Sequence, residues 1–303
     1  MTVRRSSRAL LALAALLVGA APVGAAEPLV VSTSPARHTF APAGSAIAIT
    51  FDQALLTSSV DGDSFRVFGQ QTGPAAGAVT FSNANKTLTL TPAQPFSAGE
   101  VVLVNLSHDI LAADSTPLRS AGYAFQFTVS SSFATRDFTE IDVMSNRIGG
   151  AQTRIYGALA ADLDGDRWID LTTVNEVSGD LRVFINKADG TGLYDDFLQP
   201  PYAIGLEASP HEPFDADNDG NIDIAVSATT SEGVWIARGD GDGDGTFSGS
   251  QSILTGDEPH GIAVLDADGD GDLDIVNAAY GDDELATLLN DGNGNFGAPA
   301  SFS

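Results

Sequence analysis

The sequence has no cysteine, few basic residues and, beyond its first 26 residues, no long apolar run. Without cysteine, a disulfide framework, a thiolate metal site and a cysteine nucleophile are all excluded. Only 14 lysines and arginines stand against 40 aspartates and glutamates, and the net charge of −26 excludes electrostatic binding to nucleic acid or to an anionic membrane. Glycine is abundant, with 32 of the 303 residues, which favours β structure with many turns.

The acidic residues are concentrated in the second part of the chain. Residues 1–130 carry seven acidic and seven basic residues, so their net charge is zero. Residues 131–303 carry 33 acidic and seven basic residues, a net charge of −26 (7 − 33). The chain therefore has two unlike parts, and a function that needs carboxylates belongs to the second.

The first 26 residues have the three regions of an export signal. Arg4, Arg5 and Arg8 are basic, residues 9–21 are apolar, and residues 23–26 are small enough for cleavage after Ala26. The apolar run is shorter than the roughly 20 residues that a membrane span needs. We predict a signal peptide at 1–26 and a secreted or cell-surface protein with no membrane span after the signal is removed.

Residues 27–130 alternate short apolar segments with turns. The segments predicted as strands are 46–51, 65–68, 87–90, 101–106 and 124–129. About seven short strands in about 100 residues is the pattern of an Ig-like β-sandwich. Its landmarks run in the order Ser34-Pro35, Ile49–Asp52, Leu88–Pro92, the loop Asp109–Pro117 and Phe125–Thr128.

This order of landmarks resembles the bacterial Ig-like domain of surface-layer and other exported proteins. The resemblance implies that residues 27–130 are a spacer or presentation domain. The serine-rich stretch that follows predicts a linker at 131–137.

Residues 138–303 contain a repeat of about 52 residues. Three acidic segments begin at Asp162, Asp215 and Asp266, which are 53 and 51 residues apart. An apolar strand that ends in a turn recurs with the same period, at 183–186, 234–237 and 287–290. A period of 40–55 residues with four strands per unit is the signature of a β-propeller blade.

The third unit carries the pattern most completely, in Pro259–Asp266, Asp268–Ala278 and Leu288–Pro299. It resembles the FG-GAP/VCBS repeat family, whose best-known relatives are the propellers of integrin α-subunits. The fold class that follows is all-β, an N-terminal Ig-like β-sandwich and then about three blades of an incomplete β-propeller.

A propeller usually closes with four to eight blades, and residues 136–303 have room for little more than three. We therefore expect either a fragment of a longer propeller or an open array, which a second chain could close. An open array has an unpaired blade face, through which it would associate.

The acidic loops at 162–170, 215–223 and 266–274 are the candidate metal sites. Aspartate occupies loop positions 1, 3, 5 and 9: Asp162, Asp164, Asp166 and Asp170; Asp215, Asp217, Asp219 and Asp223; Asp266, Asp268, Asp270 and Asp274. Such a set of oxygen ligands suits Ca²⁺, whereas transition metals favour His or Cys, which these loops lack. Position 12 is not the Glu of an EF-hand; the resemblance to integrin-type hairpin loops implies that the aspartate at position 9 supplies the closing carboxylate instead.

The family resemblance implies one further ligand in each loop, the carbonyl of position 7: Trp168, Asn221 and Asp272. We predict two to three structural Ca²⁺ ions. The first loop is expected to be the weakest, because Arg167 replaces a glycine at position 6 and brings a positive charge beside the ion.

Three other sequence motifs are interpreted as having no separate binding or catalytic role. Asp240–Asp244 reads as a turn instead of a fourth site, because Ser248 stands at its position 9. Arg238-Gly239-Asp240 spells the integrin-recognition tripeptide by chance, within that turn. His211 and His260 each follow a proline ahead of an acidic loop, and are expected in turns at one rim of the propeller.

The leading functional hypothesis is a non-enzymatic recognition or adhesion scaffold for a glycan, matrix or surface-protein ligand. We find no Gly-x-Ser-x-Gly, His-Glu-x-x-His or phosphate-loop motif. One alternative is a polysaccharide-active, lyase-like enzyme or its accessory module, which a cluster of Arg, Lys, Tyr or His in the central channel would favour. The other is an architectural surface-layer component, which would self-assemble when Ca²⁺ is added.

Overall fold

The computed structural model describes residues 26–133, 137 and 139–302. Residues 1–25 of the predicted signal peptide and part of the predicted linker lie outside the described residues. Within them the chain forms five open β-sheets and two short 3₁₀ turns, η1 (Thr57–Ser59) and η2 (Thr229–Ser231), which confirms the predicted all-β class. In this described part, no helix has the length and apolar character needed to cross a bilayer.

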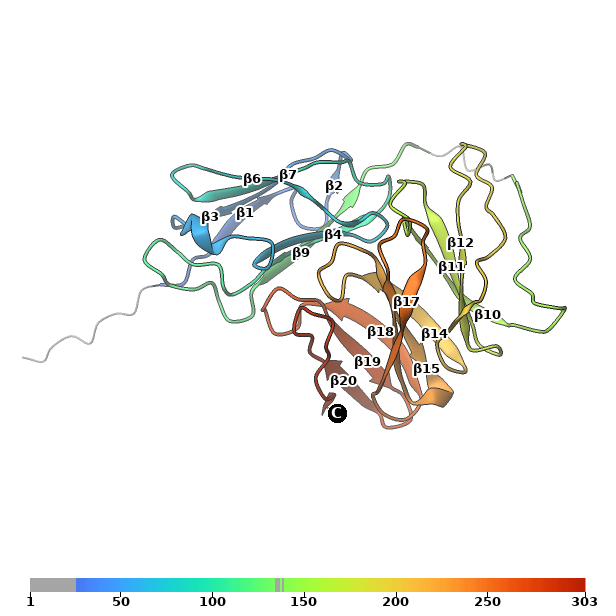
Figure 1. Ribbon diagram of the computed structural model, residues 1–303. Helices are drawn as coiled ribbons and strands as arrows, with labels where there is room; N and C mark the ends of the chain where they lie inside the picture. Colours follow the sequence, from blue (N-terminus) through green and yellow to red (C-terminus); the bar gives the residue numbers. More distant parts are fainter. Residues whose placement is uncertain (1–25, 134–136, 138, 303) are drawn as a thin grey trace, which may run out of the picture.

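Residues 30–129 form a sandwich of two sheets (Figure 1). The first sheet has the order β1 (Val30–Ser34), β3 (Ile47–Phe51), β7 (Thr87–Pro92) and β6 (Gly77–Ser82). The second has the order β2 (Phe40–Ala41), β9 (Tyr123–Val129), β8 (Val101–Leu106), β4 (Phe65–Gly69) and β5 (Gly73–Pro74). The five predicted strands are β3, β4, β7, β8 and β9, and they form the centre of both sheets.

The core of the sandwich follows from alternation along these strands. In β3, Ile47, Ile49 and Phe51 are buried, and the residues between them are more exposed. Val104 of β8 and Phe127 of β9 face them from the second sheet and are fully buried. Because side chains alternate between the two faces of a strand, this pattern leaves the other face of each sheet free to meet something else.

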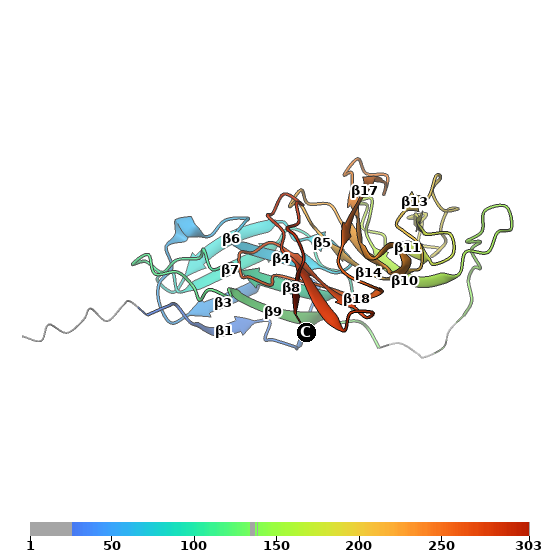
Figure 2. The same ribbon diagram turned by 90° about the horizontal axis from the view of Figure 1, so that it is seen from below.

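The outer face of the five-stranded sheet is covered by the second part of the chain. Phe68 of β4 and Asn105 of β8 lie between inward-facing neighbours, yet only 6% and 8% of their surfaces are exposed. They line a cleft of about 440 Å³, whose other wall includes Asn218 and Leu273 of the repeats. Figures 1 and 2 show the repeat sheets beside the sandwich, with their loops directed at β4 and β9.

Each repeat is a four-stranded antiparallel sheet with its strands in sequence order, as expected for a propeller blade. The sheets are β10 (Ile155–Ala161), β11 (Asp170–Asn175), β12 (Asp180–Phe184) and β13 (Tyr202–Ala203); β14 (Ala208–Phe214), β15 (Asp223–Ala228), β16 (Gly233–Gly239) and β17 (Phe247–Leu254); and β18 (Pro259–Leu265), β19 (Asp274–Ala279), β20 (Glu284–Leu288) and β21 (Ala300–Phe302). None of them closes into a barrel.

Consecutive blades pack face to face through apolar side chains. Val174 and Val183 of the first blade lie against Ile224 and Val226 of the second. Phe214 and Ile236 of the second blade pack in turn against residues of the third, among them Ile275 and Leu288. The predicted arrangement of three blades is confirmed.

The described residues 139–154, which precede the first blade, contain no strand. They contact the blade through Asn146, whose amide donates to Asn175 Oδ1 (2.5 Å) and accepts from Thr173 Oγ1 (3.2 Å). Arg182 is 1% exposed, and it donates to the Asn146 carbonyl (2.6 Å) and pairs with Asp180 (2.9 Å). The segment before the first blade therefore contacts it through buried polar groups.

A buried carboxylate shapes the turn of the sandwich that lies nearest the first repeat loop. Glu100 is 2% exposed and accepts hydrogen bonds from the backbone N–H groups of Gln71 (2.9 Å) and Thr72 (3.1 Å) and from the Thr72 hydroxyl (3.0 Å). The carbonyl of Gln71 then accepts a hydrogen bond from the N–H of Asp162 (2.7 Å). The conformation of the turn therefore depends on Glu100.

We expect Glu100→Ala to lower the free energy of unfolding by on the order of 3 kcal/mol, because it leaves several partly buried donors without an acceptor. Urea denaturation followed by circular dichroism measures the loss. Glu27→Ala, at an exposed position of the same domain, is the control and should change little. Equal stability of the two variants would contradict the role of Glu100.

Candidate metal centres

Each acidic loop joins the first strand of a blade to the second. The backbone turns through left-handed residues at positions 4 and 6 of all three loops: Gly165 (φ 77°) and Arg167 (φ 77°), Asn218 (φ 60°) and Gly220 (φ 94°), Gly269 (φ 85°) and Gly271 (φ 100°). Glycine and asparagine adopt this conformation at little cost, so the second and third loops suit it best. The N–H of position 6 donates to the aspartate at position 1 in each loop, at 3.1–3.2 Å.

The aspartate at position 9 ties the loop to the following hairpin. One carboxylate oxygen accepts from the N–H of position 2, at 2.7–2.9 Å. The other accepts from a backbone N–H 16 residues further on, at 2.8–2.9 Å, in the pairs Asp170–Asn186, Asp223–Gly239 and Asp274–Asn290. All three aspartates are almost fully buried. Sequence reasoning missed this role, because the aligned landmark ends at 186, 237 and 290, which lie 16, 14 and 16 residues after position 9, and the constant spacing appears only in the structure.

The carboxylates of positions 1, 3 and 9 come together in every loop. The groups are Asp162, Asp164 and Asp170; Asp215, Asp217 and Asp223; and Asp266, Asp268 and Asp274, with one oxygen of each residue within 4.8 Å of the others. Each group could hold a metal ion. The aspartates of position 5 are not in these groups; Asp166, Asp219 and Asp270 instead accept from the N–H of position 7, at 2.7–2.9 Å.

The second loop contains buried carboxylate oxygens that lack the partner a cation would provide. Asp215 Oδ1 and Asp217 Oδ1 are buried and have no hydrogen-bond partner. A buried carboxylate oxygen without a partner is costly, and a bound cation would supply the missing interaction. The donor set consists of oxygens only and carries three carboxylates, so the residues present fit a hard divalent cation.

Burial raises the pKa of these carboxyl groups, and the charges of neighbouring aspartates raise it further. The pKa of Asp170, Asp215 and Asp266 rises to about 6, and that of Asp223 and Asp274 to about 7. Backbone hydrogen bonds oppose the rise without cancelling it. Around neutral pH, the folded chain without a cation therefore binds more protons than the unfolded chain.

This difference predicts how stability depends on pH. In EDTA, the melting temperature should fall between about pH 5 and pH 8, because the folded-state pKa values lie above the unfolded value of 3.8 and stability is lost as the folded carboxyls ionise. The pKa of His211 is lowered to about 4 by burial and opposes the trend below pH 6.5, but it is one group against five.

Thermal melts at several pH values, in EDTA and in millimolar Ca²⁺, measure this dependence. Since a cation binds the ionised carboxylates, the increase in melting temperature produced by Ca²⁺ should be larger at pH 8 than at pH 5. A melting temperature in EDTA that rises steadily from pH 5 to pH 8 would contradict the argument.

Arg167 does not lie as the sequence predicted. Its guanidinium donates to Gln94 Oε1 (2.6 Å) and to the Pro95 carbonyl (3.1 Å), both in the sandwich. The side chain is thus bound to the other domain instead of being placed beside an ion. The expectation that the first loop binds most weakly stays a prediction: the Arg167 charge is directed to the sandwich, but its left-handed backbone (φ 77°) carries a cost that glycine avoids.

The turn at 240–246 brings Asp240, Asp242 and Asp244 together, all of them exposed. It lacks a carboxylate at position 9, and the aspartates accept hydrogen bonds from the turn itself. Arg238, the first residue of the integrin-type tripeptide, pairs with Asp217 (3.2 Å) and donates to the Gly294 carbonyl. The tripeptide is therefore not presented as a free loop.

The expectation for the two histidines was wrong, because both lie on strands instead of in turns. His211 is buried between the first and second blades, where its Nε2 lies 2.8 Å from Thr172 Oγ1. His260 stands edge-on against the ring of Tyr280, with centroids 5.6 Å apart. A proline before a histidine was too weak a signal to tell a strand from a turn.

Comparison with protein families agrees with this architecture. Residues 25–129 match the bacterial Ig-like domain, and residues 215–277, which contain the second and third loops, match the FG-GAP-like repeat. The chain thus carries a bacterial Ig-like domain followed by an FG-GAP-like repeat, as the sequence landmarks predicted. A search of curated proteins finds no significant match.

Similarity to solved structures is distant. The methionine-rich copper resistance protein PcoC from Escherichia coli is 20% identical over 35% of this chain and all of its own, with a TM-score of 0.28. Domains 1–6 of the bacterial surface layer protein SbsC are 12% identical over 87% of this chain and 33% of their own, with a TM-score of 0.29. These scores are too low for an inference about function.

Proposed function

We propose that this protein is an exported scaffold of the cell surface or extracellular space, in which Ca²⁺ bound by the three acidic loops is structural. The combination of a bacterial Ig-like domain with an FG-GAP-like repeat supports a surface or extracellular protein. The observation that carries the proposal is the pair of buried, unpartnered carboxylate oxygens of Asp215 and Asp217 within a group of three carboxylates.

Calcium fits this donor set better than other common cations. Mg²⁺ demands near-ideal octahedral geometry and keeps several waters, whereas Ca²⁺ accepts six to eight oxygens in flexible arrangements. Transition metals would favour nitrogen or sulfur ligands, and the loops offer none. With dissociation constants of about 10⁻⁴–10⁻³ M, Ca²⁺ at about 1 mM would stabilise the fold by about 0.4–1.4 kcal/mol per site.

The substitution Asp268→Asn tests the assignment at position 3 of the third loop. We choose it over Asp217 because Asp217 also pairs with Arg238. The variant should bind one ion fewer and melt at a lower temperature in Ca²⁺. In EDTA its melting temperature should be unchanged or slightly higher, since one repulsive charge is gone. Isothermal titration calorimetry and paired melts measure both effects.

Asp242→Asn is the matched control, because it removes a carboxylate from the exposed turn that has no position 9. It should leave the ion count and the effect of Ca²⁺ unchanged. If the wild-type chain binds no Ca²⁺ and melts at the same temperature in Ca²⁺ and EDTA, the cation proposal fails.

The partner of the scaffold is proposed to be a glycan, a matrix component or another surface protein. Support comes from the end of the third blade opposite the acidic loops, where Tyr280 is 68% exposed and its ring is held edge-on by His260. An exposed aromatic ring of fixed orientation is a typical contact for a sugar or a protein side chain. Binding of the protein to an array of bacterial polysaccharides, compared with Tyr280→Ala, tests this surface.

A further inference from the structure

The three acidic loops are not exposed to solvent on all sides, because each contacts the Ig-like sandwich. Their odd positions 1, 3 and 9 carry the grouped carboxylates. Contacts with the sandwich come from positions 4 and 6, through Arg167, Asn218, Gly269 and Gly271, and also from the Asp272 side chain at position 7 and the Asp162 N–H at position 1. Each loop thus has one side for the cation and one side for the other domain.

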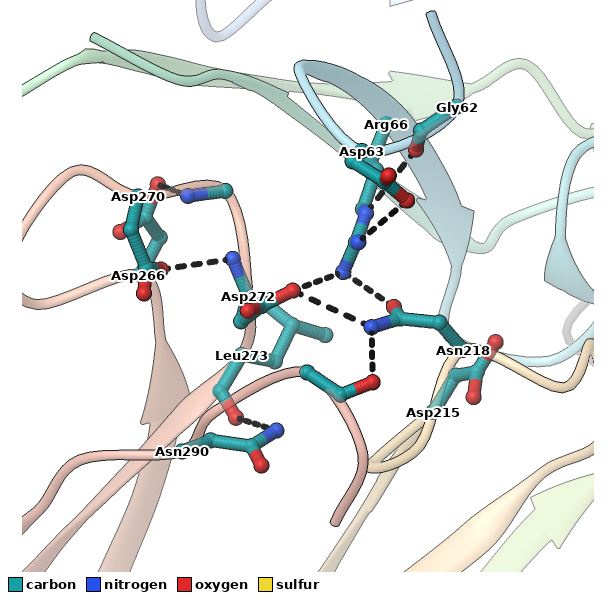
Figure 3. A network of polar contacts seen from close by, with 12 residues as sticks. Gly62, Asp63, Arg66, Asp215, Asn218, Asp266, Asp270, Asp272, Leu273 and Asn290 are labelled. Carbon is teal, nitrogen blue, oxygen red and sulfur yellow. Dashed lines mark hydrogen bonds and ion pairs between the residues drawn. The ribbon is translucent and has the colours of Figure 1, made fainter. Parts of the chain in front are cut away.

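Arg66 of β4 joins the second and third loops to the sandwich (Figure 3). Its guanidinium pairs with Asp272 Oδ1 (2.6 Å) and donates to Asn218 Oδ1. Asn218 donates in turn to the same Asp272 oxygen (3.1 Å) and to the Gly292 carbonyl (2.8 Å). Arg66 itself is oriented by the carbonyl of Gly62, at 3.0 Å from its Nε. One side chain of the sandwich therefore links two loops.

The backbone of the third loop touches the sandwich directly. The Gly269 carbonyl accepts from the His108 N–H (2.7 Å) and lies 2.6 Å from His108 Nδ1. A Cβ atom at Gly269 would come within 2.6 Å of the Gly122 nitrogen, and one at Gly271 within 2.5 Å of the Asp63 carbonyl oxygen. These two glycines are thus needed for close approach as well as for the left-handed turn.

The first loop also contacts the sandwich. Arg167 donates to Gln94 and Pro95, and the N–H of Asp162 donates to the carbonyl of Gln71 (2.7 Å). Glu100 fixes the turn at Gln71 and so the position of the Gln71 carbonyl. The backbone at Asp162 must also hold its conformation for the hydrogen bond to form. All three loops must hold their backbones in place for the domains to fit together.

We propose that cation binding and the docking of the Ig-like sandwich onto the repeats are coupled, so that the cation-loaded loops form the docking surface. The inference rests on the proposed function. A cation holds the carboxylates of positions 1, 3 and 9 together and thereby fixes the loop backbone that carries the contacts with the sandwich. Without it, the carboxylates repel one another and the loop backbone is less ordered. The free-energy cost of ordering the backbone then weakens docking. Coupling of this kind is reciprocal, so docking also raises the cation affinity.

The attraction between Arg66 and the acidic loops opposes this coupling, since a bound cation reduces the negative charge near Arg66. It is the smaller effect. Asp272 is not one of the grouped carboxylates, so a bound cation leaves the Arg66–Asp272 pair in place, whereas the contacts from all three loops depend on backbone order. The net result is tighter docking with the cation.

The absence of cysteine makes the full-length chain convenient for measuring the distance between the domains. Cysteines introduced at the exposed positions Ser82, on β6, and Ser252, on β17, can carry spin labels. The distance between the labels is then measured by pulsed electron paramagnetic resonance spectroscopy. We expect one narrow distance distribution in millimolar Ca²⁺ and a broad one in EGTA. Calorimetry on the same protein gives the number of ions bound.

The double variant Gln94→Ala with His108→Ala removes contacts on the sandwich side and changes no loop residue. It should broaden the distribution in Ca²⁺ and raise the Ca²⁺ dissociation constant by about fivefold. Thr50→Ala is the matched control, because its hydroxyl hydrogen bond, with the hydroxyl of Thr87 (3.1 Å), stays within the sandwich. It should change neither quantity.

The outcomes separate this inference from the proposed function. Ions bound with identical distance distributions in Ca²⁺ and EGTA, and with unchanged affinity in the double variant, would overturn the coupling and leave the metal assignment standing. No bound ion in the wild-type chain would overturn both. A broader distribution in EGTA together with a weaker affinity in the double variant supports the coupling.

Discussion

The mutual repulsion of carboxylates is the constraint on which the second part of this molecule depends. Thirteen aspartates lie in the three loops, and each loop joins two strands that also carry the packing between blades. Three of them, at position 9, are buried and bound to backbone N–H groups on two sides. The loops therefore cannot relieve the repulsion by opening without also giving up the hydrogen bonds that start the second strand of each blade.

Much of the architecture could be predicted because it repeats. The period of about 52 residues, with aspartates at the odd loop positions, is enough to locate three blades and their loops along the chain. Alternation of apolar residues located the central strands of the sandwich, such as β3 and β8. The edge strands were harder to find: β6 exposes most of its residues and β2 has only two, so neither shows a clear alternation.

The contacts between the domains could not be predicted, because they join residues far apart in the sequence without a local pattern. Arg66 lies more than 200 residues before its partner Asp272, and nothing around it distinguishes it from a solvated surface arginine. Arg167 looks misplaced in its loop unless its acceptor at Gln94 is known. The buried Glu100 is another case, since nothing in the sequence separates it from the six other acidic residues of the domain or gives a sign of its four hydrogen bonds.

The 16-residue link made by the aspartate at position 9 also bears on how such repeats can change during evolution. Insertions or deletions between Asp223 and Gly239 would break the link, and this stretch has the same length in all three blades. The connection to the fourth strand is under no such restraint, and it differs in length among the blades: 185–201, 240–246 and 289–299. New loop sequences, and with them new surfaces, are thus expected to arise in that connection while the hairpin before it keeps its length.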